Sequence, residues 1–573
     1  MTDIGAPPRV TSESAPGEVP NTRWLWVACW VLALLLGLAQ AWASRRVVHA
    51  DGISYLDMAG AISRGHWGEA VNGLWSPLYP VLLGLSLRIF RPSNAWEIPF
   101  AHLLNVVIYA GALGCFHFFL RGLLTTHRDA ELRASTDDPG LLPPWALISL
   151  GFAWFTWTSL QLIHLVGLLT DLCVAAFVYL GAGLLLRIRR RPAEWRIYVI
   201  LGISLGLGYW AKAPMFPMAF VFMFAAVLAA RNLRIALPRV GASLLAFLIV
   251  ATPLILAQSR AHGHLTYGES GRLNYAVYLD GIDFLDWEGQ PPGTGTPKHP
   301  PRKILDEPPV YSFTAHLKGT YPRWYDPVYW LDGVKARFTL GGQARATGQV
   351  ISQYYELFVL RQGLILGAIA TLLILSGTWH RVGRGLAEYA FLLVVPLGGM
   401  CMYAPVHVEP RMVAAYVVLL WLGLLSAAPA PYSPESARRV RGVVIFMLMA
   451  LGAQIAGRVL TDIKNQLNDP RVDWIVAEKL KRLGLAPGDT VAVAGDAVNP
   501  SWPHIAQLSI VAEIGHGSTG FWWAADPPAK SRVFQALAGT GAKALVADRM
   551  PAPDWSGDWQ QIGNTTYFVH LLR

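Results

Sequence analysis

A small number of ionisable residues stand in apolar surroundings in this sequence, and their types suit proton transfer beside a bound anion. They are Asp51, Asp171, Lys212, Glu409 and Arg411. A charged side chain at membrane depth costs free energy and usually serves a function. A carboxylate such as that of Asp51 can accept a proton from a hydroxyl group, and Lys212 and Arg411 can neutralise a phosphate.

Each of these residues also has a purely structural interpretation. Asp51 precedes a stretch with apolar residues at helical spacing, where it could serve as an N-cap. Asp171 stands at the start of an apolar segment, where it could cap the helix or interact favourably with the helix dipole. Lys212 could extend its ammonium to the membrane interface, and Arg411 could pair with Glu409 in the run His-Val-Glu-Pro-Arg. The residues alone leave both interpretations open.

For several other residues the sequence favours a structural role. His164 lies one loop away from Asp171, and we expect it to be structural. The aromatic stretch 321–330 could stack on sugar rings, but rings of this kind also gather at membrane interfaces, which we favour here. The 4 cysteines show no spacing typical of a metal site or a disulfide framework.

The elements that must position these residues are membrane-spanning helices. The chain is 53% hydrophobic and 15% charged, whereas a soluble domain carries about 25% charged residues. About eleven apolar segments are long enough to cross roughly 30 Å of hydrocarbon. They are 24–43, 99–120, 143–163, 168–187, 197–212, 214–230, 240–258, 357–378, 386–404, 412–428 and 442–459.

Short arginine-rich loops set the expected orientation. Loops 187–196, 231–239, 380–384 and 438–441 carry the cations, so we place them on the cytoplasmic side. The same pattern explains the net charge of +10 without nucleic-acid binding. Each crossing changes the side of the membrane, and with the N-terminal tail also inside, the count of crossings leaves no full crossing for 75–90. We expect this segment to be a juxtamembrane or re-entrant helix. The segments expected outside are 44–98, the tips at 164–171 and 212, the loop 259–356 and everything after 460.

Three regions follow from this topology. Residues 1–23 are rich in Pro, Ser, Thr, Gly and Glu and predict a disordered cytoplasmic tail. Residues 24–460 form the transmembrane domain, and 461–573 predict a small α/β domain outside the membrane. We expect helices at 472–483 and 526–538 and strands at 490–494, 509–512 and 543–547. Gly495 and Asp496 follow a strand, but without a G-x-G-x-x-G pattern we expect no nucleotide site.

The stretch from Asp51 to Pro80 resembles the GT-C superfamily of glycosyltransferases, most nearly the protein O-mannosyltransferases and the bacterial lipid A aminoarabinose transferase. The resemblance extends over roughly residues 24 to 460, through short motifs in a common order. The matching pieces are Asp51, Tyr55, Gly65-His66-Trp67, Ser76-Pro77-Leu78-Tyr79-Pro80, Asp171, the run 202–212 that ends in Lys212, and Glu409-Pro410-Arg411.

The resemblance implies an all-α polytopic fold and a plasma (inner) membrane enzyme that transfers a sugar from a polyprenyl-phosphate donor, with inversion. Asp51 would be the base and Asp171 its assistant, while the binding residues would be Tyr55, Lys212, Glu409, Arg411, His66 and Tyr79. Relatives often have Asp-Glu where this chain has Asp51-Gly52, so a divalent metal is an option rather than a requirement. The acceptor, whether glycan, lipid or protein, does not follow. The alternatives are a transporter or flippase of a lipid-linked substrate, and a catalytically degenerate relative.

Overall fold

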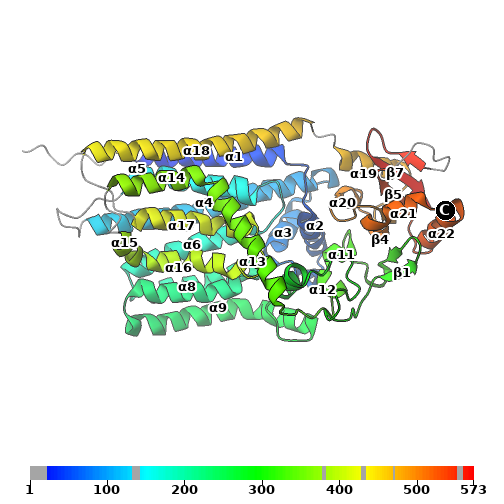
Figure 1. Ribbon diagram of the computed structural model, residues 1–573, viewed down its shortest axis with the longest axis horizontal. Coiled ribbons are helices and arrows are strands. Elements are labelled where there is room, and N and C mark those ends of the chain that lie inside the picture. Colours follow the sequence, from blue (N-terminus) through cyan, green and yellow to red (C-terminus); the bar gives the residue numbers. More distant parts are fainter. Residues whose placement is uncertain are drawn as a thin grey trace, which may run out of the picture.

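The computed structural model describes residues 22–131, 142–376, 382–427, 434–468, 471–550 and 559–572. A bundle of roughly parallel and antiparallel helices occupies one half of the molecule, and a smaller region with a β-sheet lies beyond one end of the bundle (Figure 1). The fold class expected from the sequence, a polytopic helical membrane protein with a small C-terminal α/β domain, is therefore confirmed.

Every apolar segment predicted to cross the membrane contains a helix. Among the described residues, seven helices are long and apolar enough to do so, or up to eight if the pair α15 (Val382–Glu388) and α16 (Ala390–Tyr403), bent by 82°, is one span. The helices of the bundle are α1 (Arg23–Ala43), α4 (Asn94–Glu131), α5 (Pro144–Trp157) with its π-helical end η2 (Thr158–Ile163), α6 (Asp171–Arg190), α7 (Trp195–Ala211), α8 (Met215–Ala230), α9 (Leu233–His262), α14 (Gly363–Ser376), α15 (Val382–Glu388), α16 (Ala390–Tyr403), α17 (Pro410–Ala427) and α18 (Pro434–Asn468).

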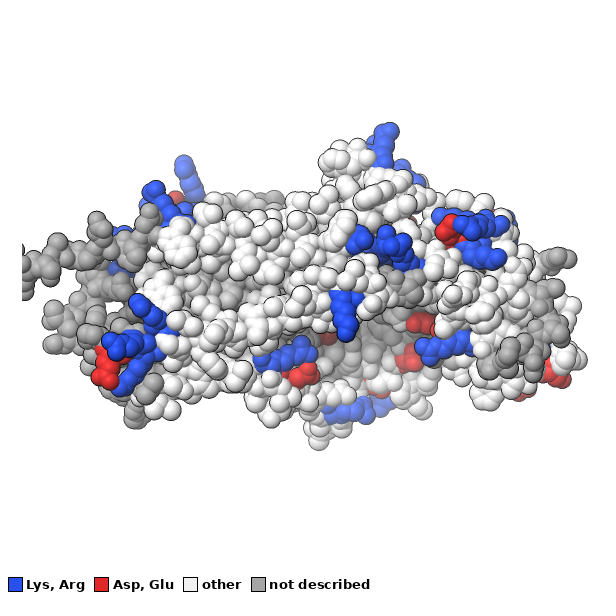
Figure 2. Space-filling view, turned by 90° about the horizontal axis from the view of Figure 1, so that it is seen from above, with Lys and Arg blue, Asp and Glu red and all other residues white. Residues whose placement is uncertain are grey.

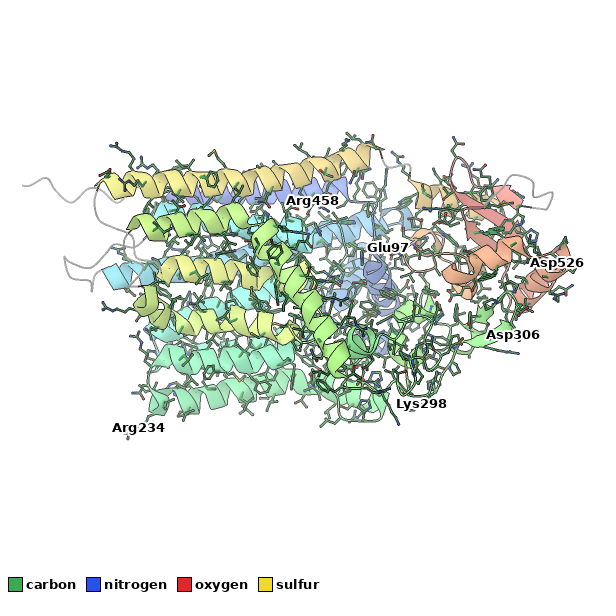
Figure 3. All side chains as sticks on the ribbon, viewed as in Figure 1. Glu97, Arg234, Lys298, Asp306, Arg458 and Asp526 are labelled. Carbon is green, nitrogen blue, oxygen red and sulfur yellow. The ribbon has the colours of Figure 1, made fainter. Side chains whose placement is uncertain are left out.

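The arginine-rich loops meet at one end of the bundle. Arg189 at the end of α6 lies 2.6 Å from Glu388, and Arg231 after α8 pairs with the same carboxylate. Arg234 marks this end in Figure 3, opposite the sheet. Asp171 begins α6, whose 20 residues span about 30 Å. Asp171 therefore lies at the other end of the bundle, next to the sheet-bearing region.

The outer surface of the bundle is largely uncharged. Figure 2 shows a broad white area between charged side chains gathered at the end far from the sheet and those nearer the sheet. Large apolar side chains such as Leu245 and Ile249 of α9 are more than 60% exposed. Such a surface suits contact with lipid rather than water.

Several short elements cover the sheet-side end of the bundle. Helix α3 has 13 residues and is too short to cross, in agreement with the sequence-based expectation for 75–90. A Cβ on its Gly84 would lie 2.8 Å from the carbonyl oxygen of Ala59 in α2, so the two helices are in close contact. The elements are α2 (Ala50–Ser63), η1 (Trp67–Ala70), α3 (Leu78–Phe90), α10 (Ser270–Tyr275), η3 (Ala276–Asp280), η4 (Thr314–His316), α11 (Pro322–Tyr325), α12 (Pro327–Trp330), α13 (Leu340–Tyr355) and η5 (Glu356–Leu360).

A seven-stranded sheet with the order β1-β2-β4-β3-β5-β7-β6 forms the far end of the molecule. The strands are β1 (Arg302–Leu305), β2 (Val310–Ser312), β3 (Thr490–Ala494), β4 (Ser509–Ile514), β5 (Ala544–Asp548), β6 (Trp559–Gln561) and β7 (Tyr567–Leu571). Only β4, β3 and β5 run parallel to one another. The helices are α19 (Val472–Arg482), α20 (Trp502–Ala506), α21 (Thr519–Ala524) and α22 (Pro527–Ala538), with the short turn η7 (His516–Ser518).

The boundary expected at residue 461 does not enclose the whole sheet. Strands β1 and β2 come from the long loop 259–356, and β2 pairs antiparallel with β4. The three strands and two helices expected in the tail are present within a residue or two, whereas β6 and β7 were not anticipated. The long loop is therefore part of the sheet-bearing region rather than a separate insertion.

Candidate active site between helix ends

Asp51 and Arg411 meet at the sheet-side end of the bundle. Asp51 lies in the first turn of α2, where His49 and not Asp51 is the N-cap, because His49 Nδ1 accepts the Asp51 N–H. Its carboxylate Oδ2 lies 3.0 Å from Arg411 Nη1, and the side chain is 11% exposed. The capping interpretation of Asp51 is therefore wrong, and the carboxylate takes part in a tertiary ion pair.

Asp171 and Lys212 complete the charged network. Lys212 is the C-cap of α7, and its Nζ lies 2.6 Å from Asp171 Oδ1. The other oxygen, Asp171 Oδ2, lies 4.0 Å from Arg411 Nη1 and is buried without a hydrogen-bond partner among the described residues. Lys212 thus pairs with a buried carboxylate instead of extending alone to the interface. Arg411 lies between the two aspartates.

Glu409 holds the guanidinium from the loop before α17. Its Oε2 lies 2.5 Å from Arg411 Nε, and its Oε1 lies 3.5 Å from His407 Nε2. Burial would raise the pKa of Glu409, but His407 and Arg411 together lower it to about 2. Glu409 is therefore ionised at any physiological pH and orients Arg411 through one edge of its guanidinium group.

A cavity of about 510 Å³ brings these groups together. Asp51, Asp171, Lys212, Glu409 and Arg411 all line it. Three carboxylates face two cations, which is a formal excess of one negative charge. The arrangement can take a proton at a carboxylate and can bind an anion at the cations, provided that the anion replaces a carboxylate partner.

Two kinds of residue line the cavity. Apolar residues come from the membrane helices and their ends, including Leu169, Pro217, Met402 and Met412. Aromatic residues come from the segments at the sheet-side end of the bundle: Trp75, Tyr278, Phe284 and Trp324. A cavity of this kind suits an amphiphilic ligand, with an apolar part toward the helices and a polar part toward the outer loops.

Tyr55 lines the cavity, but two other predicted binding residues do not. Tyr79 is fully buried behind Tyr55, with their ring centroids 5.5 Å apart, and donates to Asn105 Oδ1 at 2.9 Å. His66 is exposed just before η1 and does not line the cavity. Within the described structure, Tyr79 therefore supports Tyr55, and His66 has no contact with the site.

Some lining residues were not identified from the sequence. His407 stacks on Tyr278 with ring centroids 3.8 Å apart, although the two residues come from different loops. Val498 and Asn499 reach the cavity from the C-terminal domain. His407 stands within the run that contains Glu409 and Arg411, so its position was a usable signal. Tyr278 and Asn499 carry no local pattern that would have revealed them.

His164 and the aromatic stretch 321–330 behave structurally. Within the described residues, the His164 side chain donates from Nδ1 to the Leu160 carbonyl oxygen at 3.2 Å and does not line the cavity. Of the aromatic stretch only Trp324 lines the cavity, whereas Tyr321, Tyr325 and Trp330 are about 5% exposed or less. Ser54 of α2 donates to the Trp324 carbonyl at 3.3 Å and Tyr321 donates to Glu513 of β4 at 2.7 Å, so the stretch packs between α2 and the sheet.

The C-terminal domain anchors the helix that carries Asp51. Asp57, on the same helix α2, accepts from His504 Nδ1 at 2.8 Å and from both the backbone N–H and the hydroxyl of Thr320 at 2.6 and 2.8 Å. Glu97 of α4 lies 3.6 Å from His504 Nε2 and is labelled between the bundle and the sheet in Figure 3. The long loop, through Thr320, and the C-terminal domain, through His504, thereby fix the position of α2.

The described residues around this network are not arranged as a metal site. Among the residues that the structure describes, no group of three or more His, Cys, Asp or Glu residues is placed to hold a metal ion. Although three carboxylates line the cavity, Lys212 and Arg411 are already their partners. We therefore derive no step through a metal.

Comparison with known proteins gives distant structural similarities. No family model and no curated protein sequence matches this chain. The oligosaccharyltransferase of Archaeoglobus fulgidus, solved with a tethered acceptor peptide, is similar with 13% identity over 92% of this chain and 69% of that chain, at a TM-score of 0.45. ArnT from Cupriavidus metallidurans, solved with bound undecaprenyl phosphate, is similar with 13% identity over 96% of this chain and 98% of that chain, at a TM-score of 0.41.

Proposed function

We propose that this chain is a membrane glycosyltransferase that moves a sugar from a polyprenyl-phosphate donor to an acceptor hydroxyl, with inversion of the anomeric carbon. The observation that carries the proposal is the position of Arg411. Its guanidinium lies 3.0 Å from Asp51 and 4.0 Å from Asp171, inside a cavity that Lys212 also lines. A proton acceptor and two cations thus surround one space.

The donor phosphate would bind at Lys212 and Arg411. Arginine has five N–H donors, and the hydrogen bonds of Arg411 occupy Nε and Nη1. Its Nη2 makes no hydrogen bond within the described part of the chain, so it can approach a phosphate oxygen without breaking the contact with Glu409. Lys212 would turn from Asp171 to the phosphate. The apolar wall of the cavity would receive the first isoprene units of the lipid.

Asp51 would act as the general base. Its Oδ2 is held by Arg411, while its Oδ1 makes no hydrogen bond within the described structure and remains able to accept a proton. The acceptor hydroxyl would give its proton to Asp51 while its oxygen forms a bond to the anomeric carbon. The bond from that carbon to the phosphate oxygen breaks on the opposite face, and the electron pair leaves with the phosphate, where Lys212 and Arg411 stabilise it.

The remaining residues would support this step. Asp171 would hold Lys212 until the donor binds and would face Arg411, and Glu409 would hold Arg411 in one direction. Tyr55 and the aromatic wall at Trp75 and Trp324 would border the sugar. We propose the same orientation as the arginine-rich loops indicate, with the site at the outer face of the inner membrane and the N-terminal tail in the cytoplasm.

The transporter alternative is less well supported. Transporters usually place their charged binding groups near the bilayer midplane. Here Asp171 is the first residue of α6, Lys212 is the C-cap of α7 and Arg411 is the second residue of α17. All three stand at helix ends on one side of the bundle, where an enzyme can meet a lipid headgroup and a water-borne acceptor.

Binding of undecaprenyl phosphate to the purified protein in lipid nanodiscs tests the proposal. Native mass spectrometry should detect the phosphate bound to the wild type and about tenfold less on Arg411→Met, because a buried phosphate contact is lost. Undecaprenol, which lacks the charge, should bind weakly to both proteins. Arg361→Met removes an exposed cation paired with Glu356 and should bind like the wild type. Equal binding of the phosphate and the alcohol would contradict the proposal.

A further inference from the structure

The C-terminal domain contains a second cavity, separate from the charged network. It measures about 620 Å³, a size typical of small-molecule sites. Two segments that line it directly follow parallel strands: Gly495 and Asp496 come after β3, and Asp548 and Arg549 stand at the end of β5. Trp523 of α21 lines it too. The domain lies at the far end of the molecule from Arg234, where Figure 3 labels Asp526.

The position of the cavity in the sheet is one at which ligands bind. The chain passes from β3 to β4 on one side, and then crosses to β5 on the other side of β3. The strand order therefore reverses at the carboxyl end of β3. In open α/β sheets a crevice forms at such a switch point, and ligands bind there.

The backbone at this point is also unusual. Gly495, directly after β3, has φ of +123°, and Arg549, directly after β5, has φ of +57°. A non-glycine residue in the left-handed region is uncommon and is found preferentially at functional sites. Both parallel strands thus end in turns that direct the chain around the cavity.

The polar groups favour a neutral, hydroxyl-rich ligand. Asp496 and Asp548 are two carboxylates against the single guanidinium of Arg549, so the charge opposes a phosphate or a nucleotide. Ionised carboxylates accept strong hydrogen bonds from hydroxyl groups. Trp523 is half-buried, and its ring lies in a cluster with Trp522 and Trp559 at 5.7 Å each. A fixed aromatic ring beside two carboxylates can hold the apolar face of a sugar and its hydroxyl groups together.

One short turn separates this cavity from the cavity that holds the charged network of Asp51 and Arg411, here termed the reaction cavity. Asp496 lines the C-terminal cavity, and it accepts from the backbone N–H groups of Val498 and Asn499 at 2.9 and 3.1 Å and from the Asn499 side chain at 2.8 Å. Val498 and Asn499 line the reaction cavity. A ligand that extends past this turn would approach Asp51 from the side opposite the lipid.

We infer that the cavity at the carboxyl ends of β3 and β5 binds a neutral carbohydrate, which under the proposed function would be part of the acceptor. This role rests on that function, whereas the binding itself does not. A pyranose ring would pack against Trp523, and its hydroxyl groups would donate hydrogen bonds to Asp496 and Asp548. The turn at 495–499 would place the next sugar unit near the charged network.

Saturation-transfer NMR on the full-length protein in detergent tests this inference. The probes are methyl α-mannopyranoside, methyl β-glucopyranoside and methyl β-galactopyranoside, with glycerol as the control. At least one glycoside should show transfer that glycerol does not show. Trp523→Ala and Asp548→Asn should each weaken binding about tenfold. Phe521→Ala is the matched control, because Phe521 is 74% exposed on the same helix and does not line the cavity.

Several results would overturn the inference. One is the absence of saturation transfer from the protein to all three glycosides. Another is transfer that persists in both Trp523→Ala and Asp548→Asn but is lost in Trp75→Ala, which would place the sugar in the reaction cavity instead. A third is displacement of the glycoside by inorganic phosphate, which would identify an anion site. Asp548→Asn preserves the shape of the side chain, so it remains informative if Trp523→Ala fails to fold.

Failure of this inference can be told apart from failure of the proposed function. Trp523→Ala should leave binding of undecaprenyl phosphate unchanged, since Trp523 does not line the reaction cavity. Conversely, Arg411→Met should leave the saturation transfer to the bound glycoside unchanged. If the glycoside binds as expected and undecaprenyl phosphate does not, the site exists but its role as an acceptor site is removed.

Discussion

Arg411 Nη1 lies 3.0 Å from Asp51 Oδ2, although 360 positions of sequence separate the two residues. The contact joins α2, at the sheet-side end of the bundle, to the sheet-side end of α17, one of the last helices of the bundle. Because Asp51 is nearly buried, this guanidinium both stabilises its charge and fixes its direction. The pair is thus the point at which the fold and the proposed chemistry depend on the same atoms.

Asp51→Asn should lower sugar transfer by about 100- to 10,000-fold, because an amide cannot take the proton of the acceptor hydroxyl. The measurement is release of undecaprenyl phosphate from a panel of undecaprenyl-phosphate hexoses and pentoses in membranes. Asp283→Asn is the matched control, since Asp283 is exposed in the loop 259–356, where within the described residues it accepts only from neighbouring backbone groups. A rate close to wild type in Asp51→Asn would remove Asp51 from the mechanism, provided that both variants melt normally.

Lys212→Met should destabilise the protein, because it leaves Asp171 charged and 3% exposed without its nearest partner. We expect a loss of about 2–3 kcal/mol, below the 3–5 kcal/mol typical of fully buried pairs, since Lys212 itself is 23% exposed. Adding Asp171→Asn should recover at least half of that loss. Melting temperatures of the two single variants and the double variant measure this coupling. Additive effects would show that the pair contributes no mutual stabilisation.

The charged network was predictable from the sequence because a membrane restricts where charges can lie. Asp51, Asp171, Lys212 and Arg411 each stood at the end of an apolar segment, and the parity of the arginine-rich loops placed them on one side. Lys212 and Asp171 could be assigned to the same outer region without any knowledge of packing. That the two side chains pair at 2.6 Å could be seen only in the structure. Counting membrane crossings assigns a residue to one side of the membrane but does not say which helices are neighbours.

Other parts could not be predicted, for identifiable reasons. Strand β2 has only three residues and pairs with β4 at a distance of about 200 positions, so neither periodicity nor local turns reveal it. Tyr79 matched a motif, yet its hydroxyl is satisfied by Asn105 behind the cavity. Asn499 lines the reaction cavity from another domain, and contacts between domains leave no pattern in a single sequence.

Gly202→Ala should destabilise the contact between α7 and α9. A Cβ on Gly202 would collide with the carbonyl oxygen of Ser243 and lie 2.9 Å from Cβ of Ala246. The obstacle is backbone, so the helices must move apart, and we expect a cost of about 1–3 kcal/mol. Gly241→Ala is the matched control on α9, because a Cβ at that position would extend into open space. Equal melting temperatures for the two variants would contradict the close contact.

Raising the pH should weaken the attachment of the C-terminal domain to α2 through His504. Burial alone would lower the pKa of His504, but the carboxylates of Asp57 and Glu97 outweigh it and raise the pKa to about 10 from 6.5. Since the folded-state pKa is raised, the stabilisation is fully present below pH 6.5 and is lost as the pH rises toward about 10. The melting temperature of the wild type should therefore fall more over that pH range than that of His504→Gln, because the glutamine side chain does not titrate there. His299→Gln, at a half-exposed histidine paired with Asp332, should follow the wild type. Parallel curves for wild type and His504→Gln would show that the imidazolium does not join the domain to the helix that carries Asp51.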